Sequence, residues 1–359
     1  MPTSNEIIKL GITVSSASVT RAGFDSMLLV GDETMVDPTE VGPSGTGTFD
    51  PTMVYKYTAY SQVGDELANG YLKDMVKVAF GQQPSVGTVY VSYVDTSGTN
   101  EGITSSDITA MHEEQSDWIG YCSTFDSASD VATQAGSLVA LGKFYSVVTD
   151  STATPATTND FMALWHTKVA LDNPASSGYY PESIGRWANV ASLSYYLASV
   201  QGSYNPAFKG LQLITPNKYS ATEETALRAA NLNQYSNIGG QDLTWDGKNA
   251  SGKGYIDTYL GALYLQIRLT EDLMNMMIQT PKLPYTDGGI STVGSVIDNR
   301  LAQCTSDGYL DETRPYQISL PVASQLSDRA SRVLPNVSFI AYTTGAINTI
   351  EIQGFIDAT

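Results

Sequence analysis

The sequence predicts an α/β (α+β) fold, in which helices flank a mixed, mainly parallel sheet and an extended strand arm lies at each end of the chain. Three patterns in the 359 residues indicate this architecture. Short apolar runs alternate with helical stretches through residues 26–149, the order that builds a three-layer core around a parallel sheet. A longer helical pattern begins near residue 254, and apolar residues alternate with polar ones at both termini.

The first half of the chain predicts four strands and three helices. Apolar runs rich in β-branched and aromatic residues mark the strands, at 26–31, 87–94, 118–122 and 144–149. Apolar residues at helical spacing mark the helices, at 62–82, 105–115 and 127–141. Pro84 stops the first helix, because proline interrupts the hydrogen-bond ladder.

The stretch from 151 to 255 carries weaker signals. Helices are expected at 161–170, 187–200 and 222–233, the last one capped by Ser220 or Thr222. Residues 235–255 are hydrophilic and rich in glycine, with room for two or three short strands.

Residues 254–290 form the pattern around which the chain is organised. From 256 to 278, apolar residues recur close to the 3.6-residue period of a helix. Pro281 ends this helix, since its ring fixes φ and biases the preceding residue away from the α region. We expect an ordered loop at 282–290 and then a second helix, capped by Ser291 and running to about residue 304.

The remaining chain predicts strands at 316–320 and 337–342, with a short helix at 323–333 between them. The predicted elements divide the chain into four parts. These are an N-terminal arm at 1–20, an N-terminal α/β part at 21–150, a C-terminal α/β core at 151–335, and C-terminal strands and arm at 336–359.

Both terminal arms have one apolar face. The residues on these faces are Ile8, Leu10, Ile12 and Val14 in the first arm and Ile350, Ile352 and Ile356 in the last. An unpaired strand of this kind promotes aggregation unless it is managed. A neighbouring subunit can accept the strand into its own sheet, and contacts that do not close into a ring then build a helical assembly. These seven residues are therefore the candidate inter-subunit contacts.

The composition favours some classes of partner over others. Acidic residues outnumber basic ones 37 to 19, which gives a formal net charge of −18. Binding to nucleic acid or to an anionic membrane requires clustered Lys and Arg, so neither is expected as a partner. The 22 tyrosines suit surfaces that become buried on association.

The N-terminus shows no basic region followed by an apolar run, and no stretch approaches the roughly 20 residues of a membrane span. We therefore expect a protein that folds in a cytoplasm. Its two cysteines, Cys122 and Cys304, are expected to be reduced and partly buried.

No motif predicts a catalytic, cofactor-binding or metal site. Residues 247–254 fit G-x-x-x-x-G-K, but Gly254 has no hydroxyl to offer Mg²⁺, so we interpret the stretch as a turn. Two lone histidines give no metal-ligand spacing. His112, in a polar helix, is expected to be solvated, and His166, beside a tryptophan, to be structural.

Several segments, in order, resemble the contractile tail sheath proteins of tailed bacteriophages, in a short form. The first are FGQQP at 80–84 with the strand at 89–94, KFYSVVTD at 143–150 and NPAFKG at 205–210. The others are GYID at 254–257 with its long helix, KLPYTDGGI at 282–290, DRA at 328–330, LP at 334–335 and GAI at 345–347. The resemblance covers 140–359 well and 20–100 loosely.

The resemblance implies a structural subunit rather than an enzyme. Such subunits polymerise as a helical stack of rings around a tail tube, by exchange of terminal strands, and contract from a metastable extended state to drive the tube through the host envelope. The implied partners are copies of the chain, the tail tube protein, and the baseplate and tail terminator proteins. The implied location is the phage tail of the virion, assembled in the host cytoplasm, and no cofactor is implied.

The resemblance also implies that the C-terminal half faces the tube. The candidates are Arg268, Glu271 and Asp272 in the long helix, or Lys209 and Lys218 in the 205–218 loop.

Two other classes remain open on the sequence. One is a different assembly protein, such as a tail tube, capsid or surface-layer subunit, although a tube protein is expected to be smaller and less helical. The other is an α/β hydrolase, which a pocket with converging polar groups and perturbed pKa values would reveal.

Overall fold

The computed structural model describes residues 23–36, 49–64, 66–67, 70–97, 102–153, 155, 157–169, 181–323, 331–351 and 353. Several predicted features lie outside these residues. They are the N-terminal arm residues Ile8, Leu10, Ile12 and Val14, most of the helix at 323–333, and Ile352 and Ile356.

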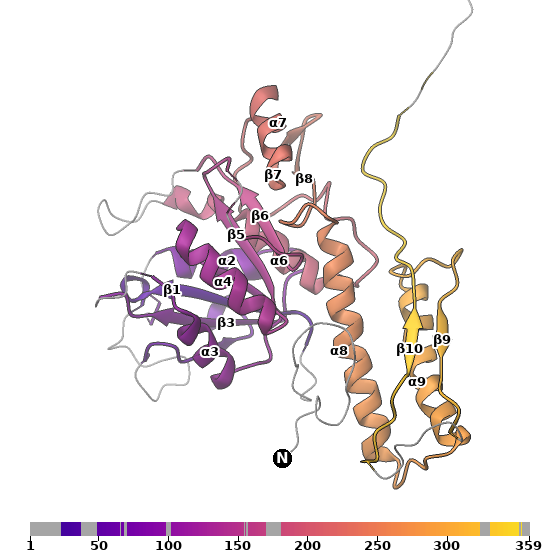
Figure 1. The fold of residues 1–359 in the computed structure, drawn as a ribbon. Coiled ribbons are helices and arrows are strands. Elements are labelled where there is room, and N and C mark those ends of the chain that lie inside the picture. Colours follow the sequence, from indigo (N-terminus) through magenta and orange to yellow (C-terminus); the bar gives the residue numbers. More distant parts are fainter. Residues whose placement is uncertain are drawn as a thin grey trace, which may run out of the picture.

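The centre of the molecule is one eight-stranded sheet with the strand order β2-β3-β1-β4-β5-β6-β7-β8 (Figure 1). The strands are β1 (Ser26–Asp32), β2 (Tyr55–Tyr57), β3 (Thr88–Val94), β4 (Gly120–Ser123), β5 (Phe144–Thr149), β6 (Met162–His166), β7 (Leu232–Ile238) and β8 (Gln241–Trp245). The six inner strands are parallel, and the two edge strands, β2 and β8, pair antiparallel. The predicted mixed α/β architecture is therefore confirmed.

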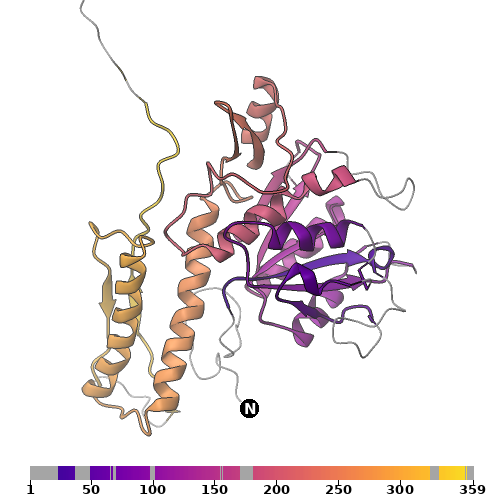
Figure 2. The ribbon, with the colours of Figure 1, turned by 180° about the vertical axis from the view of Figure 1, so that it is seen from behind.

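Helices cover both faces of the sheet (Figures 1 and 2). On one face lie α2 (Tyr71–Phe80) and α6 (Ala188–Ala198), and on the other lie α3 (Ser105–Glu114), α4 (Ala128–Ala140) and α7 (Ala221–Ala229). Successive residues of β1 show the division, because Leu28 belongs to one apolar cluster and Leu29 to the other. A strand buried on both faces is apolar throughout, which explains why the inner strands have no period of two.

Beyond the sheet, α8 (Ile256–Gln279) and α9 (Asp287–Ser306) form an antiparallel pair. The two short strands β9 (Gln317–Ser319) and β10 (Ser338–Ile340) pair antiparallel in a separate sheet. The first half of α8 packs into the core of the main sheet, and its second half packs with α9 into a third apolar cluster. We call the sheet with its covering helices the body, and the second half of α8 with α9, β9 and β10 the lobe (Figure 1).

Short 3-10 turns lie at Glu33–Met35, Tyr60–Gln62 and Pro181–Arg186. The helix predicted for 62–82 begins only at Tyr71, so its first part is wrong. The Glu66 carboxylate accepts bonds from the Gly64 N–H at 2.9 Å and from the Tyr57 hydroxyl at 2.8 Å. These bonds hold this segment outside the helix.

The helix predicted for 161–170 is also wrong, since β6 occupies Met162–His166 with every residue buried. A five-residue run buried on both faces has no period that separates a strand from a helix. The helix predicted for 222–233 ends at Ala229, and its second part becomes β7. Its predicted cap is confirmed, because the Ser220 side chain accepts from the Glu223 N–H.

The long helix ends one residue before Thr280, as Pro281 predicts. The next helix begins earlier than predicted, at Asp287, and Thr286 caps it instead of Ser291. At the C-terminus, Ile350 lies in no strand and is 76% exposed. The main sheet takes strands from both sides of residue 150, and the domain boundaries themselves stay a prediction.

Among the described residues, no helix has both the length and the apolar character that a membrane crossing requires. Both cysteines are free and buried, as predicted.

His112 is half-buried, so the prediction that it is solvated is wrong. Its ring packs edge-on against Trp118, with 5.8 Å between the ring centroids, and its Nδ1 atom is buried without a hydrogen-bond partner. Burial, together with the charge of Lys143, lowers the pKa of His112 to about 4. The imidazole is therefore neutral in the folded protein at pH 7.

We expect His112→Phe to remove a pH-dependent loss of stability. An unfolded histidine binds a proton near pH 6.5, and the folded one binds it only near pH 4, so the wild-type free energy of unfolding falls as the pH falls through that window. The difference between wild type and variant should grow by roughly 1–2 kcal/mol, less than the full shift implies because the ring is partly solvated. Urea unfolding at pH 7, 5.5 and 4.5 measures it. A constant difference across these pH values would contradict the assignment.

Candidate assembly site

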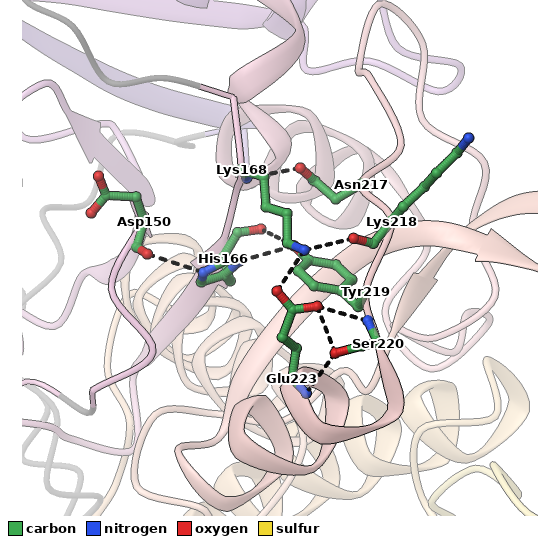
Figure 3. A network of polar contacts seen from close by, with 8 residues as sticks. All are labelled: Asp150, His166, Lys168, Asn217, Lys218, Tyr219, Ser220 and Glu223. Carbon is green, nitrogen blue, oxygen red and sulfur yellow. Dashed lines mark hydrogen bonds and ion pairs between the residues drawn. The ribbon is translucent and has the colours of Figure 1, made fainter.

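A polar network lies where β5 and β6 end, the edge of a parallel sheet at which α/β proteins commonly bind ligands (Figure 3). It lines a cavity of about 290 Å³. His166 ends β6 and Asp150 follows β5, while Tyr219 and Glu223 come from the start of α7. An active site of an α/β enzyme is most expected here.

The network satisfies its own polar groups. His166 Nε2 lies 3.1 Å from the Asp150 carbonyl, which only accepts, so Nε2 carries the proton and Nδ1 accepts from the Tyr219 hydroxyl at 2.9 Å. Burial lowers the pKa of His166, which keeps the ring neutral. Lys168 Nζ lies 2.7 Å from Glu223 and donates to the Lys218 carbonyl, also at 2.7 Å. The hydrogen bond from Lys168 is the main cause that lowers the pKa of Glu223 to about 2.

This arrangement joins the end of β6 to the start of α7. Its two pairs of hydroxyl and base are both part of this internal network, since His166 is also bonded to the Asp150 carbonyl and Glu223, which accepts from Ser220, also pairs with Lys168. His166 is thus a buried structural residue, as the sequence predicts. Within the described ranges, no three His, Cys, Asp or Glu side chains gather as metal ligands.

The stretch 247–254 folds as a closed turn, as predicted. The Asn233 side-chain oxygen accepts from the Gly247 N–H at 2.7 Å and from the Lys248 N–H at 2.9 Å. A phosphate-binding loop needs such N–H groups free to face the ligand. Here a side chain of the same protein occupies them.

A larger hollow, an apolar groove of about 1000 Å³, lies in the lobe. We call it the lobe groove. Its lining includes Leu265, Leu269 and Leu273 of α8, Val293 and Ile297 of α9, and Phe339 of β10. Val337 and Ala341 also line it, so one face of β10 looks onto the groove. Among the described residues β10 pairs with β9 alone, which leaves its other edge open to a further strand.

The described chain begins and ends in contact with other elements. At the N-terminal side, Phe24 packs edge-on against Tyr264 of α8, with 5.3 Å between the ring centroids. At the C-terminal side, the chain after β10 hydrogen-bonds to residues 309–311. Further on, Ile347 and Ile350 are 79% and 76% exposed. The exposed isoleucines show that this end of the chain offers apolar surface that its own fold does not cover.

The structure places the five candidate tube-facing residues on two elements. Arg268 pairs with Glu271 at 2.7 Å, and Asp272 accepts from Arg300 of α9 at 2.7 Å. These three residues of α8 are thus used in pairs within the lobe. Lys218 is exposed and Lys209 half-buried, in the loop that leads from α6 to α7. Within the described residues, neither lysine is ion-paired.

Sequence reasoning missed the lobe groove and the polar network. The groove had a signal, because Leu265, Leu269 and Leu273 repeat every four residues on a second face of α8. The network had none, since its bonds from His166 to Tyr219 and from Lys168 to Lys218 join residues fifty or more positions apart.

The sequence matches no protein-family model and no curated protein. The structure, in contrast, matches a chain of the anti-feeding prophage (AFP) baseplate with a TM-score of 0.70, at 12% identity, over 98% of both chains. A chain of the AFP helical sheath in its contracted state gives a TM-score of 0.69, at 12% identity and 96% of both chains. This chain has the fold of contractile sheath proteins. The PVC sheath complex, of an extracellular contractile injection system in its contracted state, gives 0.61 at 13% identity, over 97% of this chain and 95% of that one. The resemblance to tail sheath proteins is thereby confirmed at the level of the fold.

Proposed function

We propose that the chain is the structural subunit of a contractile tail sheath. The observation that carries this proposal is the agreement in fold over 96% of both chains with a protein of a helical, contracted sheath. The lobe groove and the exposed C-terminal isoleucines support it, because a subunit that exchanges strands needs both an acceptor and a donor.

The spacing of the apolar residues in the N-terminal arm matches the spacing of the leucines along the lobe groove. Every second residue of a strand advances by about 6.6 Å, and every fourth residue of a helix by about 6 Å. Ile8, Leu10, Ile12 and Val14 therefore have nearly the same spacing as the leucines under the groove, and the arm would lie along the groove above them. The backbone of the arm would pair with the open edge of β10.

In this proposal a single exchanged arm binds its acceptor groove only weakly. Burying four aliphatic side chains contributes on the order of 6–12 kcal/mol. Ordering about eight residues of arm backbone costs a similar amount, at about 1–2 kcal/mol each. The net stability of one contact is small, so the lattice depends on the many copies of it.

Contraction in this proposal needs no nucleotide or other cofactor. Subunits turn and slide as rigid bodies from a metastable extended packing to a more stable one, while the exchanged arms keep them connected. The free-energy difference between the two packings, summed over the subunits, drives the tube through the host envelope.

The proposed partners are further copies of the chain, a tail tube, and baseplate and tail terminator proteins, with neither nucleic acid nor membrane bound by the subunit. We propose a bacteriophage tail as the particle, assembled in the host cytoplasm. For the tube-facing surface we favour Lys209 and Lys218, because Arg268, Glu271 and Asp272 already pair inside the lobe.

Deleting residues 1–16 tests the arm exchange. We expect a folded, soluble monomer that forms no tubes, because the acceptor groove remains while the donor strand is gone. Circular dichroism checks the fold, and negative-stain electron microscopy across concentrations compares assembly with the full chain. Normal polymerisation of the truncated chain would show that this arm is not the connector.

Filling the lobe groove tests the acceptor. Ala341 is half-buried and lines the groove, so Ala341→Phe should occupy space that an arm needs and reduce tube formation at least several-fold. Ala302→Phe is the matched control, since Ala302 is exposed on α9 of the same lobe and outside the groove. Thermal unfolding shows whether each variant folds. Equal assembly of two folded variants would remove the groove from the proposal.

Reversing the loop charges tests the tube-facing surface. Lys209→Glu with Lys218→Glu should weaken the extended sheath on tail tubes while the isolated subunit keeps most of its stability, because Lys218 is exposed, Lys209 is half-buried, and charges in reach of solvent contribute little to folding. Lys56→Glu, on the opposite edge strand β2, is the control. Cosedimentation with cognate tail tubes at low and high salt measures the effect. Unchanged binding by the double variant would move the tube-facing surface elsewhere.

A further inference from the structure

One residue interrupts the exposed C-terminal segment. Residues 342–351 are all exposed except Asn348, which is half-buried. Its side chain makes two hydrogen bonds in opposite senses. The Asn205 Nδ2 donates to Asn348 Oδ1 at 2.7 Å, and Asn348 Nδ2 donates to the Asp246 carbonyl at 3.2 Å. Together they fix the plane of the carboxamide.

These bonds form a further contact between the lobe and the body. The segment that carries Asn348 comes from β10 in the lobe, whereas Asn205 lies in the loop after α6 and Asp246 directly follows β8. Figure 1 shows the segment rising from β10 toward the end of the body that carries β7 and β8. Elsewhere the described chain joins lobe and body along α8 and where Gly202 lies against Gly308 and Tyr309.

The receiving surface is rigid. Asn205 Oδ1 accepts from the Ala207 N–H at 3.0 Å. The next carbonyl, of Pro206, accepts from the buried Tyr196 and Thr244 hydroxyls, both at 2.8 Å. Bonds from the core of the body thus hold the loop in place whether or not Asn348 is attached. Asn348 is thus a contact of a single residue with a surface that is already formed, so the contact can open and close without rearranging the body.

We propose that Asn348 is a latch that sets where the C-terminal arm leaves the subunit. The last backbone bond before it runs from the Thr344 N–H to the Tyr309 carbonyl at 3.1 Å. Opening the latch frees residues 345–348 and lengthens the reach of the arm by up to about 13 Å. No apolar burial reinforces the contact, because Ile347 and Ile350 on either side are exposed.

Resting on the proposed sheath function, this latch gives the arm two lengths. With the latch closed, the arm starts from the body, and with the latch open it starts from the lobe at Thr344. The arm can then keep the same contact with a neighbouring subunit in two packings that place the subunits at different distances. Asn348 and Asn205 are positioning residues in this scheme, and the apolar residues of the arm make the contact itself.

The latch is tested on the full chain as a dilute monomer. Nitroxide labels at Ala226→Cys, exposed on α7, and at Ile350→Cys report the distance from body to arm, and the native cysteines are buried. Electron–electron double resonance should give a narrow distribution for the parent and one at least twice as wide for Asn348→Ala and for Asn205→Ala. Thr349→Ala, at an exposed neighbouring position, should leave it narrow. An unchanged distribution for both asparagine variants would overturn the latch.

Assembly tests the role of the latch separately. Sheaths of Asn348→Ala should differ from those of Thr349→Ala in the fraction of extended to contracted particles seen by electron microscopy. Equal fractions would show that the latch does not affect whether the sheath is extended or contracted. Failure of the parent chain to assemble on any tail tube would instead overturn the sheath function, and the spin-label distances would still decide whether the latch exists.

Discussion

The structure depends on one helix that belongs to two cores. Ile256, Leu260 and Leu263 of α8 pack into the core of the body, while Leu265, Leu269 and Leu273 pack into the lobe. Positions two apart on a helix point in nearly opposite directions, so α8 is apolar on two faces and must be covered on both. At Gly261 the ring of Tyr309 from the lobe lies so close that a Cβ atom would stand 2.1 Å from it. Body and lobe are therefore packed around a shared axis, and in the proposed sheath such a subunit would move as one unit.

The polar side chains at the sheet edge also connect elements of the subunit to one another. In an α/β enzyme, the carboxyl ends of the strands leave polar groups free for a substrate. Here His166 and Lys168 bind to carbonyls and side chains of adjacent segments, and Asn233 occupies the amides of a turn that resembles a phosphate loop. These groups join elements of the body instead of facing a ligand. A subunit whose surfaces must transmit force gains from such internal connections.

The sequence was sufficient where a local pattern decides the structure. The Ser220 cap and the proline after α8 each depend on neighbouring residues, and each prediction from them is confirmed. It failed where burial alone decides, as in β6, whose five buried residues have no period. The contact of Asn348 with Asn205 spans 143 positions, and no local pattern marks it. The lobe groove is intermediate, because its floor is a visible repeat on α8 but its wall comes from β10.

A contractile lattice sets two demands that conflict within one subunit. The bodies must keep their shape while they rotate, and the connectors must stay attached while their direction changes. The described chain separates the two demands in space. Shared packing along α8 gives the first, and an extended segment with few backbone bonds beyond Thr344 gives the second. Because an extended chain without internal hydrogen bonds changes direction at little cost, the attachment points of the arm, rather than its own structure, determine how far neighbouring subunits can move while they stay connected.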